Sequence, residues 1–239
     1  MSRRTRWLVG VPLALVVPVV GGTWVYIHVI EGPAPRPLTL GSAASPTTTV
    51  AGDRAVTTLA ATSGPFTLAG TWNPTSASQV GYRVNETLFG QSHTAVGRTH
   101  AVSGDLVIDG TTVKTAAFSV DMTTVASDQS QRDRQFQGRI MNTSQFPTAS
   151  FELTSAISLP ANPADKVASD YRATGVLTLH GVTKPISFTL KAERDGKAIA
   201  VNGSIPITFA DYQIANPSGG PAQTDDKGIL EFLVVFAHA

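Results

Sequence analysis

Apolar and polar residues alternate along most of the chain after residue 65. In one stretch, Ile186, Phe188 and Leu190 are separated by Ser187 and Thr189. A β-strand with one buried and one solvated face requires this period of two. The same alternation recurs around residues 80–88, 102–108, 116–122, 151–157 and 199–209. The pattern therefore predicts an all-β domain over residues 66–239.

Short turn sequences separate the predicted strands. Asp109-Gly110 and Asp195-Gly196 are hairpin signals, and a further turn is expected around His180-Gly181, where two β-rich segments meet. Many short strands with regular turns favour a sandwich or a barrel, and closure into a barrel removes exposed sheet edges. An antiparallel barrel of about eight strands can hold one small ligand inside. We therefore predict such a barrel.

Two further elements complete the predicted domain. One short helix is expected over Ser127–Ile140, with Ser127 and Asp128 as caps and Gly138 as its end. The last strand, residues 228–239, is apolar on both faces. Such a strand needs cover from the barrel interior and from an external helix or loop. Its exposed hydrophobic residues also make a homodimer a prediction.

The N-terminal part of the chain predicts a location at the cell membrane. A basic segment, residues 1–6, precedes an uncharged run over residues 7–30, whose 24 residues would span about 36 Å as a helix. A bilayer core is about 30 Å thick, so we expect a single-pass signal-anchor in the cell membrane with the C-terminal domain extracytoplasmic. A long cleaved signal peptide is the alternative. Residues 31–65 are rich in Pro, Thr and Ser and predict a flexible linker that reaches about 30–35 Å.

Composition excludes several function classes. The chain of 239 residues has no cysteine, which rules out disulfides, thiolate catalysis and zinc–cysteine sites. The net charge of +1 is not concentrated in either half, so nucleic-acid binding is excluded. The five histidines fall in no metal-ligand spacing, and no nucleophile or phosphate motif occurs. We predict no catalytic residue, no metal site and no cofactor, and we interpret the chain as a non-enzyme.

The apolar residues of the domain are candidates for a cavity lining as well as for a filled core. Sequence alone cannot divide the two roles. The candidate lining residues are Phe89, Leu106, Phe118, Met122, Phe136, Phe146, Phe151, Leu177, Phe188 and Phe209.

From Thr71 to the C-terminus the chain resembles the YceI-like polyisoprenoid-binding domain family. The residues that carry the resemblance are Trp72, Phe118-Ser119-Val120-Asp121-Met122, Arg132-Asp133-Arg134-Gln135-Phe136, Phe146-Pro147-Thr148-Ala149-Ser150-Phe151, the stretch from Gly175 to Phe188, and Phe209-Ala210-Asp211-Tyr212. Their order and spacing are more specific than any one piece.

The resemblance implies a lipocalin-like barrel that encloses the isoprenoid chain of a quinone or polyprenyl lipid, without known catalysis. Removing such a chain from water gains about 25 cal/mol per Å², so a dry tunnel binds it without charged residues. The polar head would then lie at the mouth, where Arg132, Arg134, His180 and a loop over residues 90–99 are candidates. A solvated helix face for the two arginines and a hydrogen-bonded turn for His180 are the plainer interpretations.

Two other function classes fit the same strand pattern. The first is a β-sandwich displayed on a stalk as an adhesion or scaffold module, which predicts a filled core and an exposed aromatic patch. The second is a hydrolase with a dispersed site, which predicts a His–carboxylate pair in a cleft.

Overall fold

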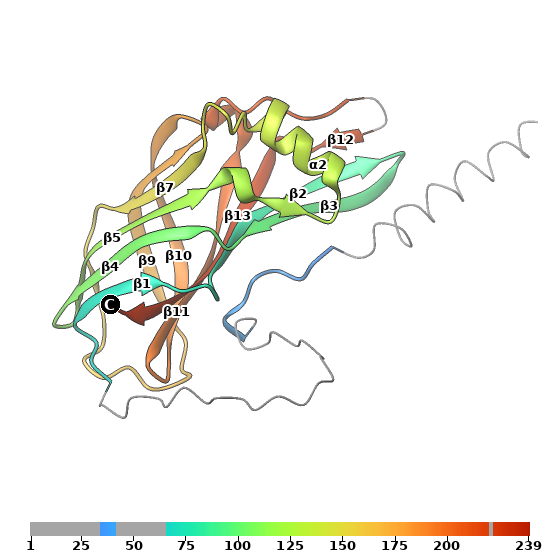
Figure 1. Ribbon diagram of the computed structural model, residues 1–239. Helices are drawn as coiled ribbons and strands as arrows, with labels where there is room; N and C mark the ends of the chain where they lie inside the picture. The colour runs from blue at the N-terminus through green and yellow to red at the C-terminus, as the bar shows by residue number, and fades with distance from the viewer. Residues whose placement is uncertain (1–33, 42–65, 220–221) are drawn as a thin grey trace, which may run out of the picture.

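One antiparallel sheet closes on itself to form a barrel (Figure 1). The computed structural model describes residues 34–41, 66–219 and 222–239. Eight strands form the ring in the order β1-β4-β5-β7-β9-β10-β11-β13, and β13 pairs back to β1. The upper half of β13 also pairs with β2, which continues the sheet through β3 to β6. The predicted antiparallel barrel of about eight strands is confirmed.

The strands and helical turns have the following bounds. The strands are β1 (Gly70–Pro74), β2 (Gln79–Leu88), β3 (Gln91–Thr99), β4 (Val102–Asp109), β5 (Thr112–Asp121), β6 (Ala126–Ser127), β7 (Thr148–Leu153), β8 (Ile157–Ser158), β9 (Ser169–Leu179), β10 (Val182–Asp195), β11 (Ala198–Thr208), β12 (Ala222–Thr224) and β13 (Lys227–His238). The helical elements are η3 (Met122–Thr124), α2 (Ser130–Gln135), η4 (Phe136–Ile140) and η5 (Phe209–Tyr212).

The predicted turns join the strands as expected. His180 and Gly181 both have positive φ angles, 50° and 75°, and connect β9 to β10 as a two-residue hairpin turn. Asp109-Gly110 and Asp195-Gly196 begin the turns after β4 and β10. The inward residues of β10 are only half-buried, although the strand alternates as predicted. A wall residue inside a closed barrel stays accessible when the interior is not filled.

The helix lies over one end of the barrel and is shorter than predicted (Figure 1). Its first residue is Ser130, because Ser127 and Asp128 use their side chains elsewhere: Ser127 hydrogen-bonds to Asp133, and Asp128 pairs with Arg132. Gly138 does not end the helix. The chain widens there into the π-helical turn η4, closed by the Met141 N–H donating to the Phe136 carbonyl over 2.8 Å.

Residues 91–99 form strand β3 and not the predicted loop. The segment is polar and lacks clean alternation, so its sequence gives a weak strand signal. Pairing with β2 over its full length supplies the missing stabilisation.

The segment 34–41, which composition assigns to a flexible linker, packs against the outside of the barrel (Figure 1). Leu38 is 7% exposed, and its carbonyl accepts a 2.6 Å hydrogen bond from Asn202 on β11. Arg83 on β2 donates to the Pro35 carbonyl over 2.7 Å. These bonds supply the external cover that β13 requires. They also cover part of the face on which the homodimer prediction rests.

A buried carboxylate lies beneath this segment. Glu231 on β13 is 4% exposed, and Arg98 donates to its Oε1 from Nη2 over 2.7 Å and from Nε over 3.0 Å. The Nε atom of Arg83 lies 3.5 Å from Oε2, and the Leu38 N–H donates to the same oxygen over 3.4 Å. The Glu231 carboxylate therefore links strands β2, β3 and β13 to segment 34–41.

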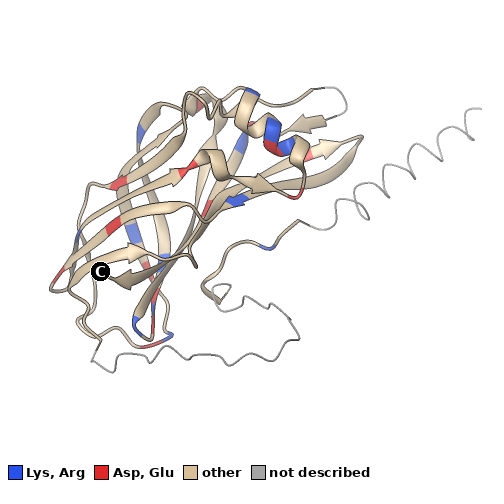
Figure 2. Cartoon of the chain, viewed as in Figure 1, with Lys and Arg blue, Asp and Glu red and all other residues tan. Residues whose placement is uncertain are grey.

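Charged residues of both signs lie along the strands, in loops and on α2 (Figure 2). The predicted segments 1–6 and 7–30 lie outside the described residues. Within the described ranges, no helix is long and apolar enough to cross a membrane.

Candidate functional site

The larger of two cavities in the barrel has a volume of about 470 Å³. Its walls are the inward faces of β2, β5, β9, β10 and β13, and α2 with η4 lies at its mouth. This volume is within the range of about 300–1,000 Å³ that is usual for ligand pockets. Because the strands alternate, the wall is apolar although the outer face is polar.

The mouth holds a half-buried tyrosine. Tyr82 on β2 stacks on Phe136 of η4, with ring centroids 4.9 Å apart and an interplanar angle of 12°. Burial raises the pKa of the Tyr82 phenol well above its ordinary value; the positive charge of Arg132 opposes the shift, and Asp133 and Glu86 add to it. The hydroxyl therefore stays protonated and can donate a hydrogen bond.

This shift predicts a pH effect on stability. In the unfolded chain tyrosine ionises near pH 10, whereas folded Tyr82 keeps its proton above that pH. Its stabilising contribution is therefore full below about pH 10 and is lost as pH rises further. We expect the free energy of unfolding to fall less steeply above pH 10 in Tyr82→Phe than in the wild type. Denaturant unfolding at several pH values measures this, and parallel slopes would contradict it.

Arg132 at the mouth is paired with acidic groups from two elements. The Arg132 guanidinium pairs with Asp128, and its Nη2 lies 3.6 Å from Glu86 Oε1 and 3.3 Å from His93 Nε2. The His93 Nε2 atom is itself 3.9 Å from Glu86. The Arg132 guanidinium thus faces two carboxylates and one imidazole nitrogen. In the described part of the chain, no group of three His, Asp or Glu could hold a metal ion.

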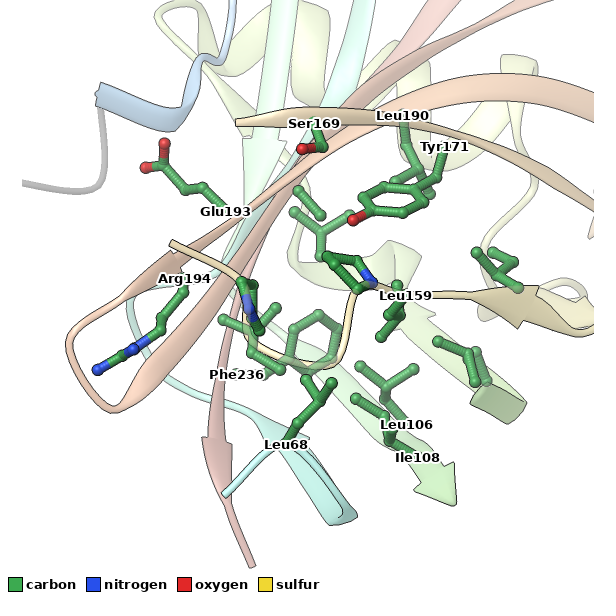
Figure 3. A pocket seen from close by; sticks show the side chains of 18 of the residues that line it. Leu68, Leu106, Ile108, Leu159, Ser169, Tyr171, Leu190, Glu193, Arg194 and Phe236 are labelled. Carbon is green, nitrogen blue, oxygen red and sulfur yellow. The ribbon is translucent and has the colours of Figure 1, made fainter. Parts of the chain in front are cut away.

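The second cavity, of about 250 Å³, is lined by residues of the barrel end opposite α2 (Figure 1), and Figure 3 shows it from close by. Leu68, Leu106 and Ile108 point into it, and the loop between β8 and β9 covers it. The charged ends of Glu193 and Arg194 point away from its apolar centre (Figure 3). The guanidinium of Arg194 instead lies 4.4 Å from the centroid of the Phe66 ring.

Eight of the ten predicted lining residues face a cavity. The larger cavity is lined by Phe118, Met122, Phe136, Phe151, Leu177, Phe188 and Phe209. The smaller cavity is lined by Leu106, and Phe118 and Phe151 line both. Phe89 and Phe146 line neither cavity. Phe89 is 57% exposed at the tip of the β2–β3 hairpin, and Phe146 packs on His180 with centroids 4.7 Å apart. Both lie at turns, where alternation no longer decides direction.

Only Arg132 of the three head-group candidates reaches the larger cavity. Arg134 is exposed on α2 and lies 3.5 Å from the Ser130 hydroxyl. His180 is a hydrogen-bonded turn residue, with its Nδ1 3.1 Å from the Tyr212 carbonyl oxygen.

Sequence reasoning missed the polar partners of Arg132 and most of the second cavity. Glu86 and His93 come from β2 and β3, and only the strand pairing brings them beside α2. Tyr82 was visible in the alternation of β2, which places it on the inner face. No local signal identified the loop that covers the second cavity as a lining segment.

The chain folds as a small closed antiparallel barrel with apolar cavities, an architecture that has room for a ligand inside. The chain belongs to the YceI-like domain family, whose model matches residues 71–236. A UPF0312 protein of Shewanella sp. (strain W3-18-1) is 32% identical over 123 residues, which are 50% of this chain and 59% of the relative. One of Shewanella oneidensis is 33% identical over 125 residues, again 59% of its length.

Two solved structures share the fold. A polyisoprenoid binding domain from Saccharophagus degradans gives a TM-score of 0.58 at 16% identity and covers 72% of this chain and 99% of that one. Burkholderia cenocepacia BcnA gives 0.53 at 18% identity and covers 68% and 98%. At these identities the likeness establishes the fold alone.

Proposed function

We propose that this protein is a membrane-tethered extracytoplasmic binding protein that encloses the isoprenoid chain of a quinone or polyprenyl lipid. The observation that carries the proposal is the larger cavity, whose wall is apolar and whose polar groups gather at the mouth. A flexible hydrocarbon fits such a space, and its head can meet Tyr82 and Arg132. The Saccharophagus domain of the same fold is described as binding polyisoprenoids, which supports this ligand class.

The unfilled interior separates this proposal from the β-sandwich alternative. A sandwich module for protein binding requires a filled core between two sheets. The single closed sheet with two internal cavities contradicts that architecture.

Membrane tethering rests on the sequence of residues 7–30, with its uncharged length and the arginines that precede it. The packed segment 34–41 would shorten the tether to residues 31–33. The four peptide steps from residue 30 to residue 34 span at most about 14 Å when fully extended. The barrel would thus stay close to the membrane surface.

Purification of the full chain in a mild detergent tests both parts. We expect mass spectrometry of its organic extract to identify an isoprenoid lipid in near-equal amount to protein. The chain should also remain in the membrane pellet after alkaline washing. Protein that is free of lipid and cannot be loaded with a quinone would overturn the ligand assignment, and a chain that washes off would overturn the tether.

A further inference from the structure

Five phenylalanine rings form a band across the middle of the barrel. Phe188 on β10 contacts Phe151 on β7, with centroids 5.5 Å apart, and Phe232 on β13 at 5.8 Å. On the other side, Phe118 on β5 contacts Phe236 on β13 at 5.5 Å. Because β13 lies opposite β5 and β7 in the ring of strands, these contacts span the interior.

The band lies between the two cavities. Their linings share only Phe118, Phe151 and Leu190. The buried core is also split into two clusters, and Phe232 packs against both. The rings therefore separate a larger chamber at the helix end from a smaller one at the other end.

Two glycines leave the space that two rings of the phenylalanine band occupy. A Cβ atom on Gly175 would come within 2.6 Å of the Phe151 ring, and one on Gly203 within 2.5 Å of the Phe232 ring. Each ring thus lies over a neighbouring strand that carries no side chain at that point. Phe118, Phe151, Phe188 and Phe232 are nevertheless only half-buried, because a chamber borders them. Rings with open space beside them can turn aside when an occupant presses on them.

We propose that this phenylalanine band sets the length of hydrocarbon chain that the barrel accepts. The inference rests on the proposed function, since it needs a chain that enters the larger chamber. A short prenyl tail fills that chamber and leaves the band intact. A longer tail must part the rings to reach the second chamber. Each aromatic contact that it breaks corresponds to about a two- to tenfold change in an equilibrium constant.

The experiment is a competition on the full chain in detergent. Short-chain and long-chain homologues of one quinone are offered together at equal concentration, and native mass spectrometry gives the ratio of the two complexes. We expect Phe151→Leu to raise the long-to-short ratio about tenfold, because it removes the contact with Phe188. Phe118→Leu should act in the same direction, and Leu190→Phe, which adds bulk at the shared lining, should lower the ratio.

Phe146→Leu is the matched control, because this ring lines neither cavity. It should leave the ratio unchanged. Ratios that stay equal in the wild type, Phe151→Leu, Phe118→Leu and Leu190→Phe would overturn the length-setting role while the carrier function stands. Failure of both homologues to bind the wild type would instead overturn the proposed function.

Discussion

Replacing Glu231 with alanine is expected to lower the free energy of unfolding by about 3 kcal/mol. The change leaves Arg98 and Arg83 without the carboxylate that they share. Removing one partner of a buried ion pair costs about 3–5 kcal/mol, because the remaining charge stays poorly solvated. The arginine side chains keep 18% and 16% exposure, which places the expected loss at the lower end. Urea unfolding of the full chain measures it.

An exposed ion pair on the same barrel provides the control. Asp170 lies 2.7 Å from Lys191, and the side chains are 60% and 57% exposed. Asp170→Ala should change stability by less than about 1 kcal/mol, since solvent already stabilises both charges. Equal losses of unfolding free energy in the two variants would mean that the burial of Glu231 contributes nothing to stability. Glu231→Ala should also expose segment 34–41 to proteolysis, because the Leu38 N–H loses its acceptor.

The alternation of residues could predict the barrel because strand direction is a local property. Each side chain of Ile186, Phe188 and Leu190 takes its face from the pleat of its own strand. The turns at Gly110, Gly181 and Gly196 are equally local, since all three residues adopt positive φ angles. A closed barrel follows because each of these strands must bury its apolar face.

Composition could not predict the packing of segment 34–41. A Pro-rich stretch lacks enough apolar surface for a core of its own, which is why it indicates a linker. The surface of the folded barrel stabilises segment 34–41 instead. Asn202 and Arg83 donate hydrogen bonds to it from strands that lie far away in the sequence. Only the apolar outer face of β13 signalled that some cover was required.

The sequence predicts most residues that line the candidate site, but it does not predict the shape of the cavity. The pattern identifies inward residues such as Phe118 and Phe151, yet it cannot say whether opposite walls meet. That depends on the circumference of the ring and on which residues face each other across it. The structure supplies both, and it places polar partners around Arg132 that lie far from it in sequence.

Filling the larger cavity is expected to reduce lipid binding at least tenfold without unfolding the barrel. Val120 is half-buried on the inner face of β5, two residues after Phe118 and two before Met122. A tryptophan there would occupy the space between the mouth and the phenylalanine band. Overpacking a filled core costs about 1–3 kcal/mol, but the cavity leaves room for the new ring, so we expect a smaller loss. Lipid content after purification and urea unfolding measure the two effects.

Ala117→Trp on the same strand separates occupancy from local damage. Ala117 is exposed on the outer face of β5, so the same bulky ring would point into solvent. We expect this variant to retain lipid like the wild type and Val120→Trp to lose it at comparable stability. If both variants keep their lipid, the ligand does not lie between the mouth and the band. A loss in both would trace the effect to strand β5 itself, because only one of the two rings enters the cavity.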